Sequence, residues 1–198
     1  MLGLNFDLLE QLTFYGSYHN NRWNQLIHFI FVPAIVWSLA VGLAYTGPLL
    51  SVPSQVLPLL ALLPTWLSSS VQLNAAFLVA AAYSLYYLCL EPVAGLSWSA
   101  CVGLPLWLSA TLFQQQVVQA WKWALLVHAL SWYMQIHPGH AILEKRKPAL
   151  LDSLVQALTL APLFVWFELL FLLGYRPQLY KQLQQRVAAN IAAHKRQH

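Results

Sequence analysis

Charged residues are scarce in this chain. Only 8% of its 198 residues are Asp, Glu, Lys or Arg, whereas 59% are apolar, and an ordinary soluble domain carries roughly a quarter charged residues. This composition excludes a water-soluble globule. The few cations stand at the ends of apolar runs and form no clustered basic face, which argues against nucleic acid as a partner. We therefore predict an integral membrane protein whose main partner is the lipid bilayer.

The chain also has few cysteines, and its N-terminal sequence lacks the pattern of a signal peptide. Cys89 and Cys101 both lie within apolar runs, where a thiol behaves as a small hydrophobic group, and two such residues form neither a CxxC zinc site nor a disulfide framework. The stretch MLGLNFDLLEQL has no basic region followed by an apolar run, so no cleavable signal peptide is predicted. Membrane insertion is expected to begin with the first apolar span.

The apolar runs predict an all-α polytopic membrane helical bundle with about four to six membrane segments, some of them re-entrant or interfacial. We treat residues 1–198 as a single membrane domain. It begins with an amphipathic helix at 5–18, which lies in the interface or packs on the bundle, and a first histidine island up to residue 28. The membrane spans follow within 29–136 and are interrupted at 47–70 by a proline-rich re-entrant or interfacial stretch. A second island at 137–153, an apolar run at 154–174 and a basic polar tail at 175–198 complete the chain.

The first island holds His19 and His28. Nine residues apart on one straight helix, the two imidazoles would point to opposite sides. They can converge only if Asn20-Asn21 ends one element and a new helix begins near Trp23, and Asn is a frequent helix N-cap.

The second island holds His137 and His140. Their spacing fits one helix face, but the intervening Pro138-Gly139 favours a turn from which both imidazoles converge. An ionisable side chain at membrane depth is costly without partners, which makes each island a candidate site.

Topology connects the islands. If the proline-rich stretch does not cross, an even number of spans separates them and both lie on one face of the bilayer. Arg22 and Lys145–Lys147 flank that face, so the positive-inside rule makes it cytosolic. The basic tail would then lie opposite if 154–173 crosses fully, and for this reason we favour a hairpin kinked at Pro162.

Imidazole binds iron, zinc, copper or nickel, and two histidines with a carboxylate and open positions suggest non-haem Fe(2+) that handles O2. Glu144 is that carboxylate, an acceptor that orients an imidazole, or a residue that pairs with nearby lysines or caps local backbone. His128 is either a ligand or a core histidine bonded to a neighbouring helix. Glu168 is either a buried partner of a histidine or a residue at a hairpin mouth.

These residues carry a resemblance to the Mpo1-like family. The first island resembles its opening signature at Tyr15, His19, Asn24, His28 and Pro33. The second island resembles its other signature at Trp132, Gln135, Gly139-His140, Glu144, Pro148-Ala149-Leu150, Asp152, Ala161-Pro162 and Glu168.

The resemblance implies an endoplasmic-reticulum membrane enzyme, an Fe(2+)-dependent dioxygenase that uses O2 to shorten 2-hydroxy fatty acids from phytosphingosine degradation by one carbon. It implies His19, His28 and His140 as metal ligands, and the pairing of His137 with His140 in the second island adds His137 as a fourth expected ligand. Further expected site residues are Glu144 in the catalytic set, Asn24 and Gln135 beside the cofactor, and Arg22 or one of Lys145 to Lys147 on the substrate carboxylate.

Two other classes remain open. A lipid-binding or transport protein could use buried histidines as a ligand cradle or proton relay without consuming O2. A membrane-shaping protein would need none of the histidines. Metal analysis separates these alternatives from an oxygenase.

Overall fold

The computed structural model describes residues 5–197, except for the side chains of Lys195 and Gln197. Within that range the regular elements are all helical, as the sequence predicts. They are α1 (Leu8–Gly16), α2 (Arg22–Ala44), α3 (Leu57–Leu60), α4 (Thr65–Ser68), α5 (Ala75–Leu90), α6 (Pro92–Trp98), the π-helical η1 (Ser99–Gly103), α7 (Leu104–Gln116), α8 (Ala120–Met134), the π-helical η2 (Gln135–Glu144), the 3₁₀ turn η3 (Ala149–Leu151), α9 (Leu154–Leu172) and α10 (Pro177–Gln197).

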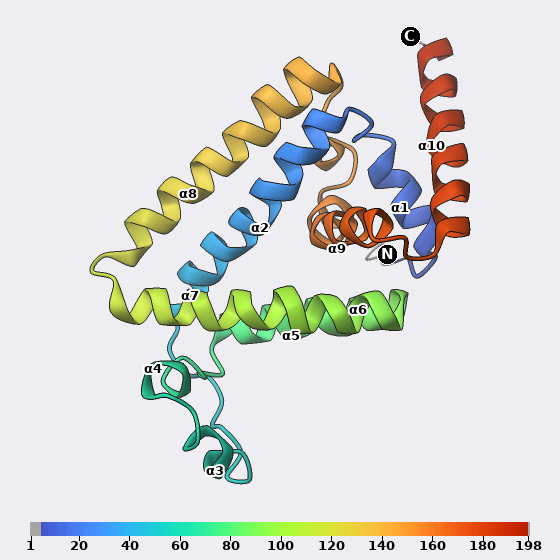
Figure 1. Cartoon of the computed structure of the whole chain (residues 1–198). Coiled ribbons are helices and arrows are strands. Elements are labelled where there is room, and N and C mark those ends of the chain that lie inside the picture. The colour runs from blue at the N-terminus through green and yellow to red at the C-terminus, as the bar shows by residue number, and fades with distance from the viewer. Residues whose placement is uncertain (1–4, 198) are drawn as a thin grey trace.

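The helices form three groups (Figure 1). Helices α2 and α8 pack side by side, and η2 continues α8 along the N-terminal part of α2. Helix α5 and the α6–η1–α7 helix pack against each other and run across the far end of that pair. Helix α9 lies between these groups and α1, which packs on α10. The first island and η2 therefore meet at one end of the bundle.

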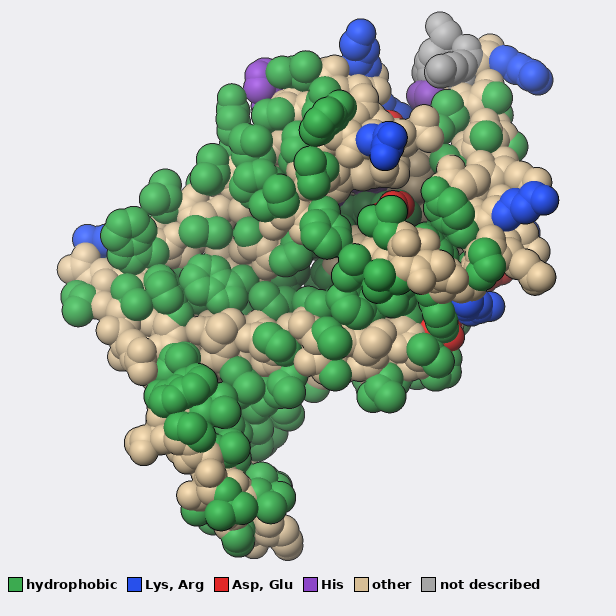
Figure 2. Space-filling view, viewed as in Figure 1, with side chains coloured by type: hydrophobic (Ala, Val, Ile, Leu, Met, Phe, Trp, Pro, Cys, Tyr) green, Lys and Arg blue, Asp and Glu red, His purple; other side chains and the backbone are tan. Residues whose placement is uncertain are grey.

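Three helices are long and apolar enough to cross a membrane, namely Arg22–Ala44, Pro92–Gln116 and Leu154–Leu172. Large apolar side chains on their outer surfaces and on the α3–α4 segment are exposed, as expected for contact with lipid. Figure 2 shows hydrophobic side chains over α8, α7 and the α3–α4 segment, while most visible Lys and Arg side chains lie toward α10 and the end of α8. The predicted membrane helical fold is confirmed.

The predicted hairpin at 154–173 is wrong, because α9 runs as one helix through Pro162. A proline inside a helix removes the hydrogen bond to the carbonyl four residues earlier, here that of Leu158. The hydroxyl of Tyr83 on α5 donates to this Leu158 oxygen at 3.0 Å. A neighbouring helix thus supplies the missing donor, which is how membrane helices tolerate proline.

The break predicted at Asn20-Asn21 is confirmed. Helix α1 ends at Gly16, and Asn21 begins α2 as its N-cap, with its side-chain oxygen accepting from the N–H groups of Trp23 and Asn24. The amphipathic segment is helical only over Leu8–Gly16, and its buried residues pack on α9 and α10. The proline-rich stretch forms the short helices α3 and α4, which project from the bundle (Figure 1).

Candidate metal centre

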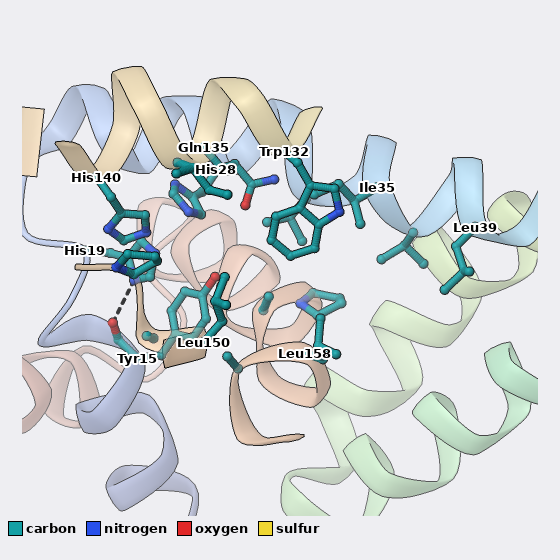
Figure 3. A pocket seen from close by; sticks show the side chains of 18 of the residues that line it. Tyr15, His19, His28, Ile35, Leu39, Trp132, Gln135, His140, Leu150 and Leu158 are labelled. Carbon is teal, nitrogen blue, oxygen red and sulfur yellow. Dashed lines mark hydrogen bonds between the residues drawn. The ribbon is translucent and has the colours of Figure 1, made fainter. Parts of the chain in front are cut away.

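Three histidines from both ends of the chain converge. His19 follows α1, His28 lies in the second turn of α2, and His140 lies on η2. One ring nitrogen from each lies within 4.8 Å of the others, and the ring planes stand at 73° to 82° to one another. The rings thus face a common centre (Figure 3). Three imidazoles at this separation can hold one metal ion.

Backbone hydrogen bonds fix the tautomers of two of these rings. Nδ1 of His19 lies 2.8 Å from the carbonyl oxygen of Tyr15, and Nδ1 of His28 lies 2.9 Å from that of Asn24. Because a carbonyl can only accept, both Nδ1 atoms carry the proton and both Nε2 atoms keep a lone pair. An imidazole held in this way is the usual form of a metal ligand.

Burial keeps the group neutral. It holds the pKa of His19 well below its usual range, with further lowering by His28 and His140. Burial also lowers the pKa of His140 to about 4, against a smaller opposing effect of Glu144. At neutral pH these imidazoles have free lone pairs, the state that metal binding requires. Nε2 of His19 and Nδ1 of His140 are buried without a hydrogen-bond partner among the described residues, so the donor set fits a metal.

A largely apolar cavity opens from the histidines. It contains about 800 Å³ of empty space, its open mouth included. The three histidines, Tyr15 and Gln135 form its polar end, and Figure 3 shows Trp132, Leu158 and Leu39 further along. An elongated apolar pocket with polar groups at one end suits a ligand with a polar head and a hydrocarbon chain.

The structure does not bring His137 to the other three histidines. Its side chain is exposed, and its ring stacks on Tyr133 with centroids 5.5 Å apart. The predicted turn at Pro138-Gly139 is also wrong, because the chain continues there as the π-helix η2. A π-helix takes more residues per turn than an α-helix, so His137 and His140 no longer share a face.

Replacing His137 by alanine is therefore expected to leave metal content and activity within about twofold of the original protein, since surface changes have small effects. Metal per protein, measured by mass spectrometry after purification, checks this result. Loss of the metal in this variant would show that His137 is a fourth ligand after all.

Glu144 joins the two islands through hydrogen bonds. Its carboxylate accepts from the N–H groups of Asn20 (2.9 Å) and Asn21 (3.0 Å) and from Nδ2 of Asn24 (3.1 Å). These donors lie at the start of α2, where a negative charge is favourable. Of its three predicted roles, the structure supports backbone capping, but across about 120 residues of sequence rather than locally.

Asn24 positions the centre and does not line the cavity. Its side chain is fully buried and bonds to Glu144, while its carbonyl orients His28. A Cβ atom at Gly139 would lie 2.5 Å from the Asn24 side-chain oxygen. Glycine is therefore needed at this position for η2 to approach α2 closely enough to place His140.

The predicted carboxylate binders Arg22 and Lys145 are both exposed and line no described cavity. Arg146 turns inward instead. Its guanidinium donates to the carbonyl of Ser17 at 2.6 Å and lies 4.2 Å from the centre of the Tyr18 ring, so it holds the second island against the end of α1. Nothing in the run of three cations distinguishes it in the sequence.

Gln135 and Tyr15 contribute directly to the cavity. Gln135 is 6% exposed, and its Nε2 has no partner among the described residues. The Tyr15 ring stacks on His19 at 4.1 Å with an interplanar angle of 5°, and burial raises its pKa, which keeps the phenol neutral. Tyr15 thus fixes the His19 ring from both its carbonyl and its side chain.

The two undecided residues fall outside the group of three. His128 forms hydrogen bonds with Ser38 Oγ on α2 and with the Trp132 indole, from which it accepts, both at 2.9 Å. Of the two predicted roles, metal ligand or core histidine bonded to a neighbouring helix, the structure supports the second. Glu168 lies on α9 and lines a small cavity together with His19 and His28. It is not at a hairpin mouth, because α9 has no hairpin.

The fold and the centre define the class of this protein. It is a helical membrane protein in which buried histidines, suited to binding a metal, face an apolar cavity. The Mpo1-like family, described as 2-hydroxy-palmitic acid dioxygenase Mpo1-like, matches residues 6–173. The chain is also 36% identical over 178 residues to the 2-hydroxy-palmitic acid dioxygenase MPO1 of Saccharomyces cerevisiae, with 90% of this chain and 88% of the relative covered. The chain belongs to the Mpo1-like family. No solved structure matches it significantly.

Proposed function

We propose that the protein is an Fe(2+)-dependent dioxygenase that converts 2-hydroxy fatty acids to fatty acids one carbon shorter. The observation that carries the proposal is the meeting of three buried, neutral imidazoles at the polar end of an apolar cavity. The named activity of the yeast relative gives the substrate class. The overall reaction balances when the 2-hydroxy acid and O2 give the shorter acid, CO2 and water, so no external reductant is needed.

His19, His28 and His140 would hold the iron. All three offer neutral imidazole nitrogens, a ligand type that suits iron, and three ligands leave positions open for substrate and O2. When bound, the iron would supply the redox chemistry that activates O2.

The remaining residues bind and orient the substrate. The apolar wall formed by α2 and α9 receives the acyl chain, which places the carboxylate and the 2-hydroxyl at the histidine end. There the Nε2 group of Gln135 has a hydrogen to donate to a substrate oxygen. Burial of this amide without a partner costs about 1–3 kcal/mol, so a bound oxygen atom stabilises it. The cavity also keeps water from the reacting carbons.

We place the enzyme in the endoplasmic reticulum, with the centre near the cytosolic surface. Arg22 and the run Lys145–Lys147 flank the islands, and cations near span ends favour the cytosolic side. A cysteine replacing exposed Lys145 should react with an impermeant maleimide in sealed, outside-cytosolic microsomes. Protection from the reagent would place the centre on the lumenal side.

The central experiment measures metal and turnover together. Protein purified in detergent without oxygen is analysed for bound metals, then given 2-hydroxypalmitate and O2. We expect stoichiometric iron, with O2 consumed, CO2 released and the shorter acid formed in equal amounts. Palmitate, which lacks the 2-hydroxyl, serves as the matched control and should not be consumed.

Other outcomes point to other functions. Binding of 2-hydroxypalmitate without O2 uptake, in protein reloaded with Fe(2+), would indicate a lipid-binding or transport protein that uses the histidines as a cradle. Stoichiometric zinc with no restoration of turnover by iron would contradict the redox assignment.

A further inference from the structure

A second apolar cavity continues the first along α2. The residues of α2 that line the histidine cavity lie on one face, His28, Val32, Ile35, Val36 and Leu39. The second cavity is lined by the next part of the same face, from Val36 to Leu43, together with residues of α5 and of the α6–η1–α7 helix. From His28 to Leu43 this face extends roughly 22 Å at 1.5 Å per residue. The two cavities therefore lie end to end.

Among the described residues, only three side chains line both cavities. They form the partition between the histidine cavity and the second cavity. They are Val36 and Leu39 of α2 and Tyr83 of α5. With the open space at their mouths included, the second cavity measures about 320 Å³ and the first about 800 Å³, so the second is the smaller and tighter of the two. The second cavity exposes almost only apolar atoms, which suits hydrocarbon and no polar head.

Tyr83 is the fixed part of this partition. Its hydroxyl donates to the Leu158 carbonyl on α9, and its ring contacts those of Tyr87 and Trp98, with centroids 5.6 Å and 6.0 Å away. A side chain held at both its ring and its hydroxyl cannot swing aside without breaking a hydrogen bond in an apolar environment. The end of the histidine cavity is thus a rigid wall.

We propose that Tyr83 sets the longest acyl chain that the enzyme accepts, by closing the histidine cavity from the second apolar cavity. This inference rests on the proposed function, which places the carboxylate end of the substrate at the histidines. The methyl end of the chain then points along α2 toward Tyr83. Removing the ring joins the cavities and gives room to additional methylene groups.

The test compares kcat/KM for 2-hydroxypalmitate with that for the longer 2-hydroxylignocerate. In Tyr83→Ala the ratio should shift toward the longer substrate by about tenfold or more, because a single methylene in an apolar pocket already changes selectivity by about 10–200-fold. Val36→Ala, which trims the partition without freeing a backbone carbonyl, should shift the ratio in the same direction. The control Leu85→Ala changes an exposed residue of the same helix that lines neither cavity and should leave the ratio unchanged.

A filling variant strengthens the test. Ala80 lines the second cavity one helical turn before Tyr83. Adding Ala80→Leu to Tyr83→Ala should return the preference toward 2-hydroxypalmitate. An unchanged ratio in both Val36→Ala and Tyr83→Ala would overturn the proposal.

A binding measurement separates this inference from the proposed function. Thermal stabilisation by palmitate and by lignocerate requires no turnover and reports only on cavity length. A shift toward lignocerate in the partition variants supports the inference even if no O2 is consumed. Turnover of 2-hydroxypalmitate with equal stabilisation in all variants leaves the dioxygenase in place and contradicts the role of Tyr83.

Discussion

Replacement of His140 by alanine is expected to abolish stoichiometric iron binding and to lower product formation by at least about 100-fold. Residues that merely orient metal ligands are worth about 10–100-fold, and His140 supplies one of only three converging imidazoles among the described residues. His19→Ala and His28→Ala should have effects of the same size. Iron content and turnover of 2-hydroxypalmitate measure the loss.

The fold of the His140→Ala variant should survive. Nδ1 of His140 has no hydrogen-bond partner within the part of the chain that the structure describes, so alanine removes a buried unsatisfied group as well as some packing. Added Fe(2+) should raise the unfolding temperature of the original protein by mass action and leave that of the variant unchanged. His137→Ala, three residues away and exposed, is the matched control. Iron-dependent stabilisation of both variants alike would show that iron binds elsewhere.

Replacement of Glu144 by glutamine is expected to weaken the centre without removing a ligand. Glutamine offers one acceptor oxygen where the carboxylate receives three hydrogen bonds from Asn20, Asn21 and Asn24. Hydrogen bonds to a charged group are worth about 1.5–3 kcal/mol each, and this group is partly exposed. We expect unfolding to become easier by about 2–3 kcal/mol and iron affinity to fall by about 10–100-fold.

Excess Fe(2+) distinguishes positioning from ligation. Turnover by Glu144→Gln should recover in saturating iron, because its three imidazoles remain, whereas His140→Ala should not recover. The exposed Glu10→Gln serves as the control for loss of one carboxylate. Failure of saturating iron to restore a folded Glu144→Gln protein would make Glu144 part of the metal site itself.

The meeting of the islands could be predicted from local sequence signals. Apolar run lengths gave the membrane helices, and Asn21 marked the break that turns His19 and His28 toward each other. The position of His140 required knowledge of packing, because Gly139 lets η2 approach Asn24 closely. Spacing alone could not exclude His137, since nothing in the local sequence marks the π-helical turns that move it away from the face of His140.

Features that depend on distant partners could not be predicted. The carboxylate of Glu144 bonds to residues about 120 positions away, and the sequence near Glu144 suggests only adjacent lysines. Likewise Pro162 appeared to break its helix, because the donor that replaces the missing N–H comes from Tyr83. The cavity wall on α9 was missed for the same reason.

The double role of Tyr83 constrains how this enzyme can diversify. Position 83 must fill space beside Leu39 and must also present a hydroxyl to the Leu158 carbonyl, and few other amino acids do both. Natural relatives that act on substrates of different chain length are therefore expected to differ first at Val36 or Ala80, where the size of the side chain can change without exposing a backbone oxygen. Tyrosine is expected to be kept at position 83.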